Sequence, residues 1–518
     1  MRASLTKRDA SRVKAWQAGL LAVGLAVVFG LGHPGASWGS SAYDPTSDPY
    51  SMQNITASDG VQAWWNAGYT GRGVDVAVID TGIAAVPGLN APGKVINAPD
   101  LSLESQNQNL LHLDTNGHGT FMAGLVAGND GQPSGYRGVA PDARVVSLKV
   151  GVADGGTDVT QVIAAIDWVV QHRRDNGMNI RVINLSYGTN STQAYGIDPL
   201  AYAVEQAWKA GIVVVAAAGN SGYQTGASAL GLADPGYDPQ ILAVGAADAM
   251  GTATLWDDQV ASYSASSASC SSSCRAPDVI APGTHMQGVR VPGSYIDQNN
   301  PVGALGDRYF RGSGTSEAAA FVSGAAADLL QRYPQLTPDQ VKAMLTSSCG
   351  KLSSYNWKQQ GCGELDMNKL LGASVPSVFA SQQYNAASIG TGSLEASRGS
   401  DHLSMNGVLL QGEQDIFGQP FNSAAMAALE AAGSSWSGGN WNGSSWSGSS
   451  WSGSSWSGSS WSGSSWSGSS WSGSSWSGSS WSGSSWSGSS WSGSSWSGSS
   501  WSGSSWSGNG WLGASWGR

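Results

Sequence analysis

The sequence contains little charge for its length. Only 12% of its 518 residues are charged, and 35 acidic residues outnumber 25 lysines and arginines, which gives a formal net charge of −10. Residues 1–42 hold five of the basic residues and one acidic residue, so the rest of the chain carries −14. A chain this acidic repels phosphates and anionic lipid headgroups. We therefore expect neither nucleic acid nor an anionic membrane as a partner.

Long apolar runs are equally scarce. The one extended run, from about residue 18 to residue 31, follows the basic residues of the N-terminus and precedes a stretch of small residues. This order is typical of a secretory signal. The run is shorter than the roughly 20 residues that cross a bilayer, which favours a cleaved signal over a retained anchor. We expect residues 1–42 to be the signal and the mature protein to be secreted or associated with the cell surface.

Cysteine is also rare, with four residues in the whole chain. An even number of cysteines in an exported protein favours two disulfides. Proximity suggests that Cys270 pairs with Cys274 and Cys349 with Cys362, although four cysteines allow three pairings. A zinc site is the alternative, but no histidine lies near either pair to complete it.

Residues 43–379 alternate short apolar runs with stretches of helical spacing. The apolar runs predict strands that are buried on both faces, at residues 73–79, 143–150, 180–185, 211–217 and 241–245. The stretches between and after them predict helices at residues 159–174, 199–210, 316–333 and 338–347. Strands that alternate with helices predict a three-layer α/β domain with a mostly parallel central sheet.

The C-terminal part of the chain has a different composition. The pattern weakens over residues 380–433, which we interpret as a linker or a small accessory segment. From Trp436 to Trp516 a tryptophan recurs every fifth residue, mostly as W-S-G-S-S, with no charge before Arg518. A period of five puts neighbouring indoles on opposite faces of a strand, so a packed core is hard to build. Residues 434–518 are therefore predicted to be a disordered low-complexity tail; the alternative is an adhesive segment whose rings stack on cell-wall polysaccharide or on each other.

Two short motifs place ionisable side chains beside predicted elements. V-I-D-T-G puts Asp80 directly after a strand, at the carboxyl edge where open parallel sheets gather their sites. N-G-H-G-T puts His118 at the start of a helix, between glycines that let other backbone approach the ring. Taken alone, the first motif can be a simple turn and the histidine a structural residue.

Two more motifs supply a hydroxyl group and an amide. G-S-G-T-S-E-A puts Ser316 near the N-terminus of an Ala-rich helix, where it is either a plain cap or a nucleophile beside free backbone N–H groups. A-G-N-S-G puts Asn220 directly after a buried strand, either as turn chemistry or as a donor to an oxyanion. A hydroxyl nucleophile needs a base, a carboxylate that orients the base, and such donors. The four motifs together provide all of these groups.

The combined motifs resemble the Asp, His, Asn and Ser blocks of subtilisin-like serine peptidases of the S8 type, in the chain order Asp, His, Ser. The matching stretches are V-A-V-I-D-T-G-I, N-G-H-G-T-F-M-A-G, V-V-V-A-A-A-G-N-S-G and G-T-S-E-A-A-A-F-V-S-G. R-G-V-A-P, I-N-L-S-Y-G and D-V-I-A-P-G match further family segments in the same order.

The resemblance implies a role for each matching residue. Asp80 orients His118, His118 acts as general base and then as acid, Ser316 is the nucleophile, and Asn220 contributes to the oxyanion hole. In the family, two segments bind the substrate backbone and wall the primary specificity pocket. The matching residues here are Ser186, Tyr187, Gly188, Ala216, Ala217, Ala218 and Gly219.

Two features differ from the family pattern. Glu317 stands next to the nucleophile, where its charge would oppose an oxyanion unless the carboxylate points to solvent or is paired. Acidic ligands for the family's calcium ion are not matched, although Asn129 and Asp130 lie in the corresponding loop. The resemblance implies no cofactor for catalysis and leaves a structural calcium ion unassigned.

We therefore expect a secreted, monomeric serine endopeptidase that hydrolyses polypeptides through an acyl-enzyme on Ser316. The small and apolar pocket walls predict a broad specificity that favours apolar residues before the cut. The alternative is a non-catalytic surface or adhesion protein that keeps the fold and attaches through the Trp repeats. A second alternative is a dedicated processing enzyme with the tail as its tether.

Overall fold

The computed structural model describes residues 43–107, 109–132, 134–223, 231–266, 275–405 and 408–446, together with short backbone strands between residues 450 and 516. The chain divides into two units, residues 1–42 and residues 43–518, and the predicted signal lies outside the described residues. Within the described part, no helix has the length and apolar character needed to cross a membrane.

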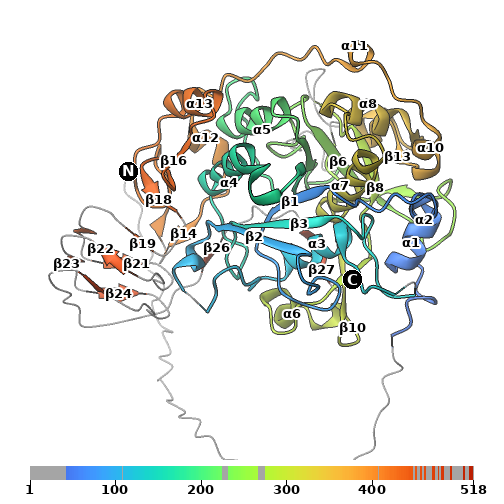
Figure 1. The fold of residues 1–518 in the computed structure, drawn as a ribbon, viewed down its shortest axis with the longest axis horizontal. Helices are drawn as coiled ribbons and strands as arrows, with labels where there is room; N and C mark the ends of the chain where they lie inside the picture. Colours follow the sequence, from blue (N-terminus) through green and yellow to red (C-terminus); the bar gives the residue numbers. More distant parts are fainter. Residues whose placement is uncertain are drawn as a thin grey trace, which may run out of the picture. The chain divides into compact units, whose positions relative to one another are not determined.

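A ten-stranded sheet forms the centre of the unit of residues 43–518 (Figure 1). Its strands are β1 (Asp75–Asp80), β2 (Val95–Asp100), β3 (Arg144–Lys149), β4 (Ile180–Leu185), β5 (Val213–Ala217), β6 (Leu242–Asp248), β7 (Gln259–Val260), β8 (Val279–Pro282), β12 (Cys349–Gly350) and β13 (Glu364–Leu365). Their order is β12-β13-β8-β6-β5-β4-β1-β3-β2, and β7 pairs with β6. Only the β12–β13 and β6–β7 pairs of these described strands are antiparallel.

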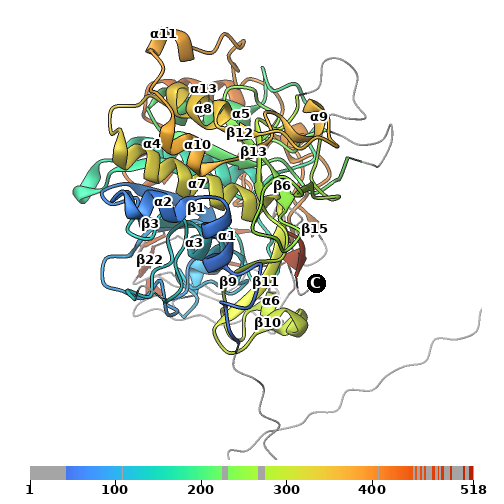
Figure 2. The same cartoon turned by 90° about the vertical axis from the view of Figure 1, so that its right-hand side faces the viewer.

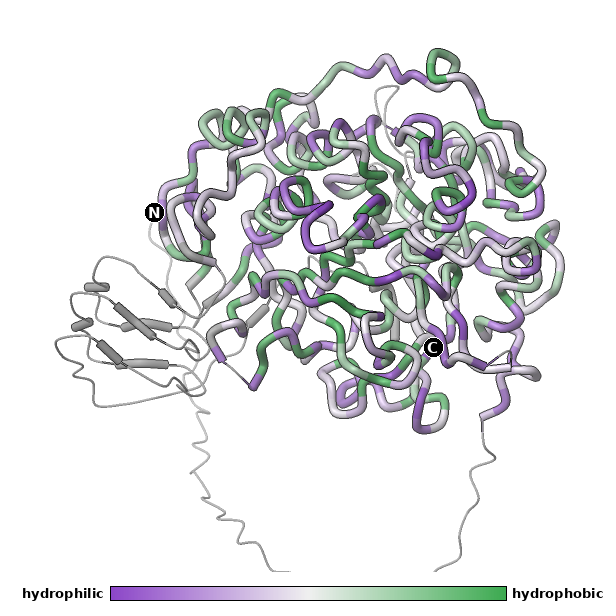
Figure 3. Tube along the Cα trace, in the orientation of Figure 1, coloured by the Kyte–Doolittle hydropathy of each residue, from purple (hydrophilic) through white to green (hydrophobic). Residues whose placement is uncertain are grey.

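The central strands are buried because both of their faces are apolar. Every residue of β1 and of β5 is buried, and hydrophobic residues follow the central strands in Figure 3. All five predicted strands are present, within three residues of their predicted ends. The prediction of a three-layer α/β fold with a mostly parallel sheet is confirmed.

Helices cover both faces of the sheet (Figures 1 and 2). Helices α3 (His118–Ala127) and α7 (Thr315–Arg332) pack against each other, as do α4 (Val159–His172) and α5 (Pro199–Lys209). The side chains of Asp158 and Asp198 cap α4 and α5 by accepting backbone N–H groups, which explains where these helices begin. The four helices predicted at residues 159–174, 199–210, 316–333 and 338–347 are all confirmed.

The remaining helices before residue 382 are short and lie around this frame. They are α1 (Met52–Ser58), α2 (Val61–Asn66), α6 (Tyr295–Asn299), α8 (Pro338–Ser347), α9 (Trp357–Gln360), α10 (Met367–Gly372) and α11 (Val378–Ser381), with 3-10 turns at Leu103–Gln106, Asp175–Gly177 and Pro301–Gly303. A disulfide joins Cys349 to Cys362 beside β12, as predicted. The predicted partners Cys270 and Cys274 lie outside the described residues.

A second sheet leads into α7. Its strands are β9 (Met286–Val289), β10 (Ala304–Leu305), β11 (Tyr309–Gly314) and β27 (Gly513–Trp516). Strand β11 runs directly into α7. Strand β27 pairs with the last three residues of β11 in antiparallel register. The C-terminal end of the repeat therefore lies beside the strand that precedes Ser316.

Residues 380–433 pack on helices that cover the central sheet. They contain α12 (Leu394–Arg398), β14 (Ser404–Met405), β15 (Val408–Leu409) and α13 (Ser423–Ala431), and α13 contacts α5. Arg398 forms a fully buried ion pair with Asp158, with 2.6 Å between Nε and Oδ2. The Thr189 hydroxyl donates a hydrogen bond to the Ser397 carbonyl. Thr189 lies two residues after Tyr187, which was predicted to bind substrate. The interpretation of this part as a linker or a small accessory segment stays a prediction.

The first three tryptophans of the repeat also pack on the domain. Trp436 and Trp441 lie in a small antiparallel sheet formed by β16 (Trp436–Ser437), β17 (Asn440–Trp441) and β18 (Ser444–Ser445), and Trp446 follows its last strand. Trp436, Trp441 and Trp446 are at most 9% exposed. The Trp436 indole donates to the Ala164 carbonyl at 2.8 Å, which fixes the sheet to α4. The structure thus differs from the predicted tail boundary at residue 434, because this sheet buries its indoles against a neighbouring helix.

Later repeats contain short backbone strands with a constant register. They are β19 (Ser450–Trp451), β20 (Trp456–Ser457), β21 (Ser460–Ser462), β22 (Ser470–Ser472), β23 (Trp476–Ser477), β24 (Ser480–Ser482), β25 (Trp491–Ser492) and β26 (Trp506–Ser507). Each parallel pair joins residues 20 positions apart, so tryptophan aligns with tryptophan. Twenty residues are four W-S-G-S-S units. Most of the predicted tail lies outside the described residues, so its disorder stays a prediction.

Candidate active site

Asp80 and His118 meet at the carboxyl edge of the sheet. Asp80 is the last residue of β1, and His118 is the first residue of α3. The His118 Nδ1 atom lies 2.7 Å from Asp80 Oδ1, and both side chains are at most 2% exposed. Gly119 permits this approach, since a Cβ there would lie 2.2 Å from the Gly82 carbonyl oxygen. Gly119 thus lets other backbone approach closely beside His118, as the sequence predicted.

Asp114 organises the start of α3, and the sequence analysis missed it. Its Oδ1 accepts the Gly117 N–H at 2.7 Å and the Thr81 hydroxyl at 2.8 Å. Its Oδ2 accepts the Thr120 N–H at 2.8 Å. The carboxylate therefore satisfies the helix N-terminus and joins it to the residue after Asp80. An acidic residue four positions before His118, with Thr120 following, was the available signal.

The carboxylates around His118 make it more basic. Burial by itself disfavours the imidazolium, but the charge and hydrogen bond of Asp80 outweigh it and raise the pKa of His118 above its ordinary value. The charges of Glu317 and Asp114 act in the same direction with smaller effect. A more basic imidazole is better suited to accept a proton from a hydroxyl group.

Ser316 lies in the first turn of α7, as the sequence predicted, with its side chain fully buried. Its hydroxyl donates to the Ser186 carbonyl at 3.3 Å, and the Ser186 hydroxyl donates to the Ser316 carbonyl at 3.2 Å. These reciprocal hydrogen bonds join α7 to the segment that follows β4. The Asn184 amide donates to Ser186 Oγ at 3.0 Å and fixes that hydroxyl in turn.

Thr315 joins Asn220 to the same helix. The Asn220 Oδ1 atom accepts the Thr315 N–H at 3.0 Å and the Thr315 hydroxyl at 3.1 Å. The Gly219 N–H donates to Thr315 Oγ1 at 3.1 Å. Because the amide oxygen is held from α7, the amide plane has a fixed orientation and Nδ2 is its donor end. The role of Thr315 was not predicted from the sequence.

The predicted substrate-binding residues follow two adjacent strands. Leu185 pairs with Ala216, so the segment after β4 lies beside the end of β5. The first segment is Ser186, Tyr187 and Gly188, and the second is Ala216, Ala217, Ala218 and Gly219. All of them are buried, and the Tyr187 ring is 1% exposed within the main core. The structure brings the two segments together, and the Tyr187 ring packs within the core.

Glu317 differs from the expectation of a solvent-facing or paired carboxylate. Its side chain is fully buried in α7, and it forms no ion pair with any described lysine or arginine. Burial raises the pKa of Glu317 to about 7, against the opposing attraction of His118. Because burial disfavours a charge, the group is partly protonated near neutral pH.

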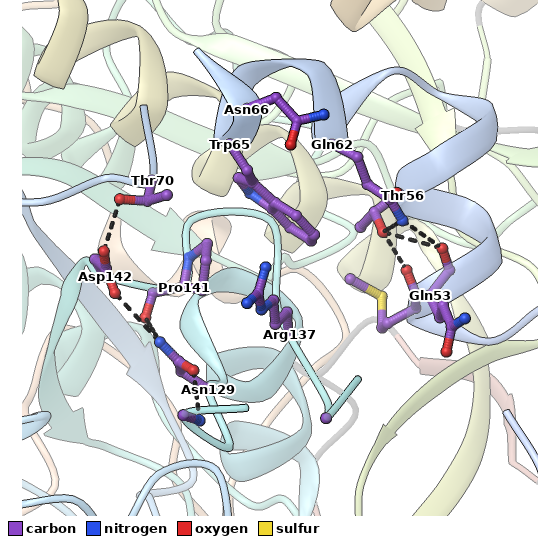
Figure 4. Close-up of a pocket in the computed structure, with 13 residues that line it drawn as sticks. Gln53, Thr56, Gln62, Trp65, Asn66, Thr70, Asn129, Arg137, Pro141 and Asp142 are labelled. Carbon is purple, nitrogen blue, oxygen red and sulfur yellow. Dashed lines mark hydrogen bonds between the residues drawn. The ribbon is translucent and has the colours of Figure 1, made fainter. Parts of the chain in front are cut away.

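The loop suggested for calcium uses its polar atoms internally. Asp130 pairs with Arg308 at 2.8 Å and accepts the Tyr136 N–H. The Asn129 amide donates to the Pro141 carbonyl and to Asp142, beside a polar pocket of about 640 Å³ (Figure 4). A guanidinium already neutralises Asp130, and the described residues contain no group of three His, Cys, Asp or Glu side chains suited to a metal. The residues of this loop do not fit a calcium ion.

Comparison with known proteins places this site in a family. The model of the Subtilase family matches residues 71–373, which is more than half of the chain and includes every residue of the candidate site. This chain belongs to the subtilase family. As a subtilase it is a subtilisin-like serine endopeptidase that acts on polypeptides, and the alternative of a non-catalytic adhesion protein is not favoured.

Individual subtilases show how far the similarity extends. Serine protease AprX of Bacillus subtilis (strain 168) is 39% identical over 301 residues, covering 57% of this chain and 66% of AprX. Subtilisin DY of Bacillus licheniformis is 36% identical over 314 residues, covering 60% of this chain and 95% of subtilisin DY. A crystal structure of a cold adapted subtilisin-like serine proteinase matches 57% of this chain and 88% of its own, with 26% identity and a TM-score of 0.41.

Proposed function

We propose that Asp80, His118 and Ser316 are the catalytic triad of this endopeptidase. The 2.7 Å contact between His118 Nδ1 and Asp80 Oδ1 carries the proposal, because it fixes the imidazole tautomer with Nε2 as the basic atom. His118 accepts the hydroxyl proton as Ser316 Oγ attacks the scissile carbonyl. The imidazolium then protonates the leaving amine, and a water activated by His118 hydrolyses the acyl-enzyme.

The oxyanion of the tetrahedral intermediate is stabilised by Asn220 Nδ2 and by the Ser316 backbone N–H. Thr315 supports this role, since its two bonds hold the Asn220 amide in one orientation before substrate binds. Ser316 also lies in the first turn of α7, where backbone N–H groups and the helix dipole favour negative charge. These donors need no reorganisation when charge develops.

A substrate backbone adds as a strand to Ser186–Gly188, and its side chain before the cut enters a pocket walled by Ala216–Gly219. Small apolar walls favour apolar and aromatic residues at this position, so we propose a broad, apolar-leaning specificity. A peptide library that instead shows a strict requirement for Arg or Lys would refute this specificity. The reaction needs no cofactor.

The enzyme acts outside the cell, with residues 1–42 as its export signal and the folded chain as a monomer. Repeats after Trp446 contact cell-wall polysaccharide through their indole rings and retain the enzyme at the surface. The density of tryptophan without charge supports this role, because exposed indoles need a partner in water. Retention on isolated cell wall, compared between the full chain and a chain ending at Trp446, measures this contribution.

The triad is tested with unfolded casein and a fluorogenic peptide. We expect the secreted protein to cleave both, and His118→Ala and Ser316→Ala to lose the activity while keeping the same circular dichroism spectrum. Activity that survives both substitutions would exclude these residues. A parallel panel of native surface proteins separates general degradation from processing of one partner.

A further inference from the structure

Strand β27 (Gly513–Trp516) fills an edge of β11 directly before the proposed nucleophile. It pairs with residues 312–314 in antiparallel register and also contacts α7, the helix that carries Ser316. Gly312 pairs with β9 as well, and one residue pairs with two strands only across its two edges. At this position β27 therefore closes the edge of β11 that β9 leaves open.

The sequence of β27 differs from the repeat before it. From Trp446 to Ser505 every unit reads W-S-G-S-S, whereas the following ones read W-S-G-N-G, W-L-G-A-S and W-G-R. At four residues β27 is longer than the other described strands of the repeat, which have two or three. The match to the Subtilase family ends at residue 373, so β27 lies outside it. The segment beside the active site is therefore distinct from both the family domain and the uniform repeat.

The same edge is where a substrate continues after the cut. In the proposed function the residues before the cut pair with Ser186–Gly188, and Ser316 attacks the carbonyl that ends them. β11 runs directly into the turn that holds Ser316, so the residues after the cut leave the nucleophile along this strand. β27 runs in the same direction, because its first residue pairs with Gly314 and its last with Gly312. An edge bonds one strand at a time, so β27 and such a substrate exclude each other.

We propose that β27 is an autoinhibitory strand that competes with polypeptide substrates for the edge of β11. The proposal rests on Ser316 as the nucleophile of the proposed function. Strand addition uses backbone N–H and C=O groups, so it depends little on the side chains of the competing peptide. The inhibition therefore applies to any substrate that extends beyond the cut, and spares a substrate that ends there.

A short tether keeps β27 near this edge. β26 (Trp506–Ser507) pairs with β14 (Ser404–Met405), and only five residues separate β26 from β27. A short linker gives a docking segment an effective concentration on the order of millimolar. The ladder between β27 and β11 has only three residue pairs, so its pairing is reversible. β27 is therefore docked for most of the time, and a substrate displaces it at sufficient concentration.

The test compares the full chain with a chain that ends at Gly510, on a fluorogenic peptide with three residues after the cut. A strand that is docked in about nine of ten molecules raises the apparent KM about tenfold, so removing residues 511–518 should lower KM by about that factor at unchanged kcat. A peptide p-nitroanilide has no residue after the cut, and its KM should be the same for both chains. Equal KM values for the extended peptide, or an equal gain for both substrates, would overturn the proposal.

A double proline variant tests the pairing in a chain of full length. Successive N–H groups of a strand alternate in direction, so either Ala514 or Ser515 directs its N–H towards β11. The double substitution Ala514→Pro and Ser515→Pro removes that donor and should lower KM for the extended peptide as the truncation does. Ser494→Pro with Ser495→Pro is the matched control, because it changes the same two positions of a unit four repeats earlier, and it should keep the wild-type KM. A control variant that gains as much would contradict the proposal.

A binding measurement separates this proposal from the proposed function. With Ser316→Ala in both the full and the shortened chain, the fluorescence anisotropy of a labelled extended peptide reports binding without cleavage. We expect about tenfold tighter binding to the shortened chain. Tighter binding together with activity that survives Ser316→Ala would refute the nucleophile and keep β27 as a competitor. Equal binding to both chains, with activity that Ser316→Ala abolishes, would refute the autoinhibition alone.

Discussion

The Trp441 indole donates to the Asp167 carboxylate at 2.7 Å, and both side chains are at most 2% exposed. Trp441 belongs to the W-S-G repeat, whereas Asp167 lies on α4 of the catalytic frame. The Trp441 ring also contacts Trp446 at 5.0 Å between centroids. The start of the repeat is therefore part of the folded enzyme.

This contact predicts that Trp441 contributes to stability. Trp441→Ala removes a buried indole and should lower the free energy of unfolding by about 3–5 kcal/mol. Trp441→Phe keeps most of the ring but removes one of the two side-chain hydrogen bonds to Asp167, and should cost about 1 kcal/mol. Denaturant titration measures both values. Trp256→Ala is the control, because that side chain is 80% exposed and should change stability little.

The same contact predicts a pH dependence of stability. Burial raises the pKa of Asp167 to about 7, against hydrogen bonds from Trp441 and Ser435 that lower it. The folded state therefore holds a proton that the unfolded chain releases near its ordinary value of 3.8. By linkage, this contribution is present below about pH 4 and is lost as the pH rises towards 7. Asp167→Asn should make the fall in stability across this interval shallower by the contribution of one proton, because other buried carboxyl groups such as Asp238 and Asp415 also have raised pKa values. An unchanged slope would contradict the assignment.

Two truncations distinguish the packed repeats from those that follow. A chain ending at Trp446 keeps the sheet of β16, β17 and β18 but loses the pairing of β27 with β11, so its melting temperature should not exceed that of the full protein. A chain ending at Gly433 exposes the surface of α4 that Trp436 and Trp441 cover, and should melt several degrees lower. Equal melting temperatures for the two chains would show that the three indoles add no stability.

Asn220→Ala tests the proposed oxyanion hole. Removing one such donor lowers kcat by about 100- to 1000-fold in serine proteases, with little effect on KM, and we expect a loss of that size here. Asn66→Ala, at an exposed position on α2, should leave both constants unchanged. A loss that appears only in KM would instead indicate a role in ground-state binding.

The sequence predicted the frame because its signals are local. Buried parallel strands such as β4 are continuous apolar runs, and each candidate catalytic residue stands at the end of a strand or the start of a helix. The roles of Asp114 and Thr315 depend on hydrogen bonds across the site, and short polar residues of this kind are common in ordinary turns. Their functions became visible only with the fold.

Burial was the property that the sequence predicted least well. Glu317 reads as a favourable acidic residue in a first helical turn, yet the folded chain buries it completely. Trp441 reads as one member of a uniform repeat, yet in the fold its indole donates to Asp167 on α4 and its ring contacts Phe421. In both cases the outcome depends on which surface folds against the residue, and local composition does not encode that.

The central claim is that Ser316 is the nucleophile, and covalent labelling tests it most directly. The secreted protein is treated with a fluorophosphonate probe, and the modified peptide is located by mass spectrometry, with Ser316→Ala as the control. The account predicts a single phosphonylated residue, Ser316, and no label on the variant. Absence of label on active wild type, or equal label on both proteins, would contradict it.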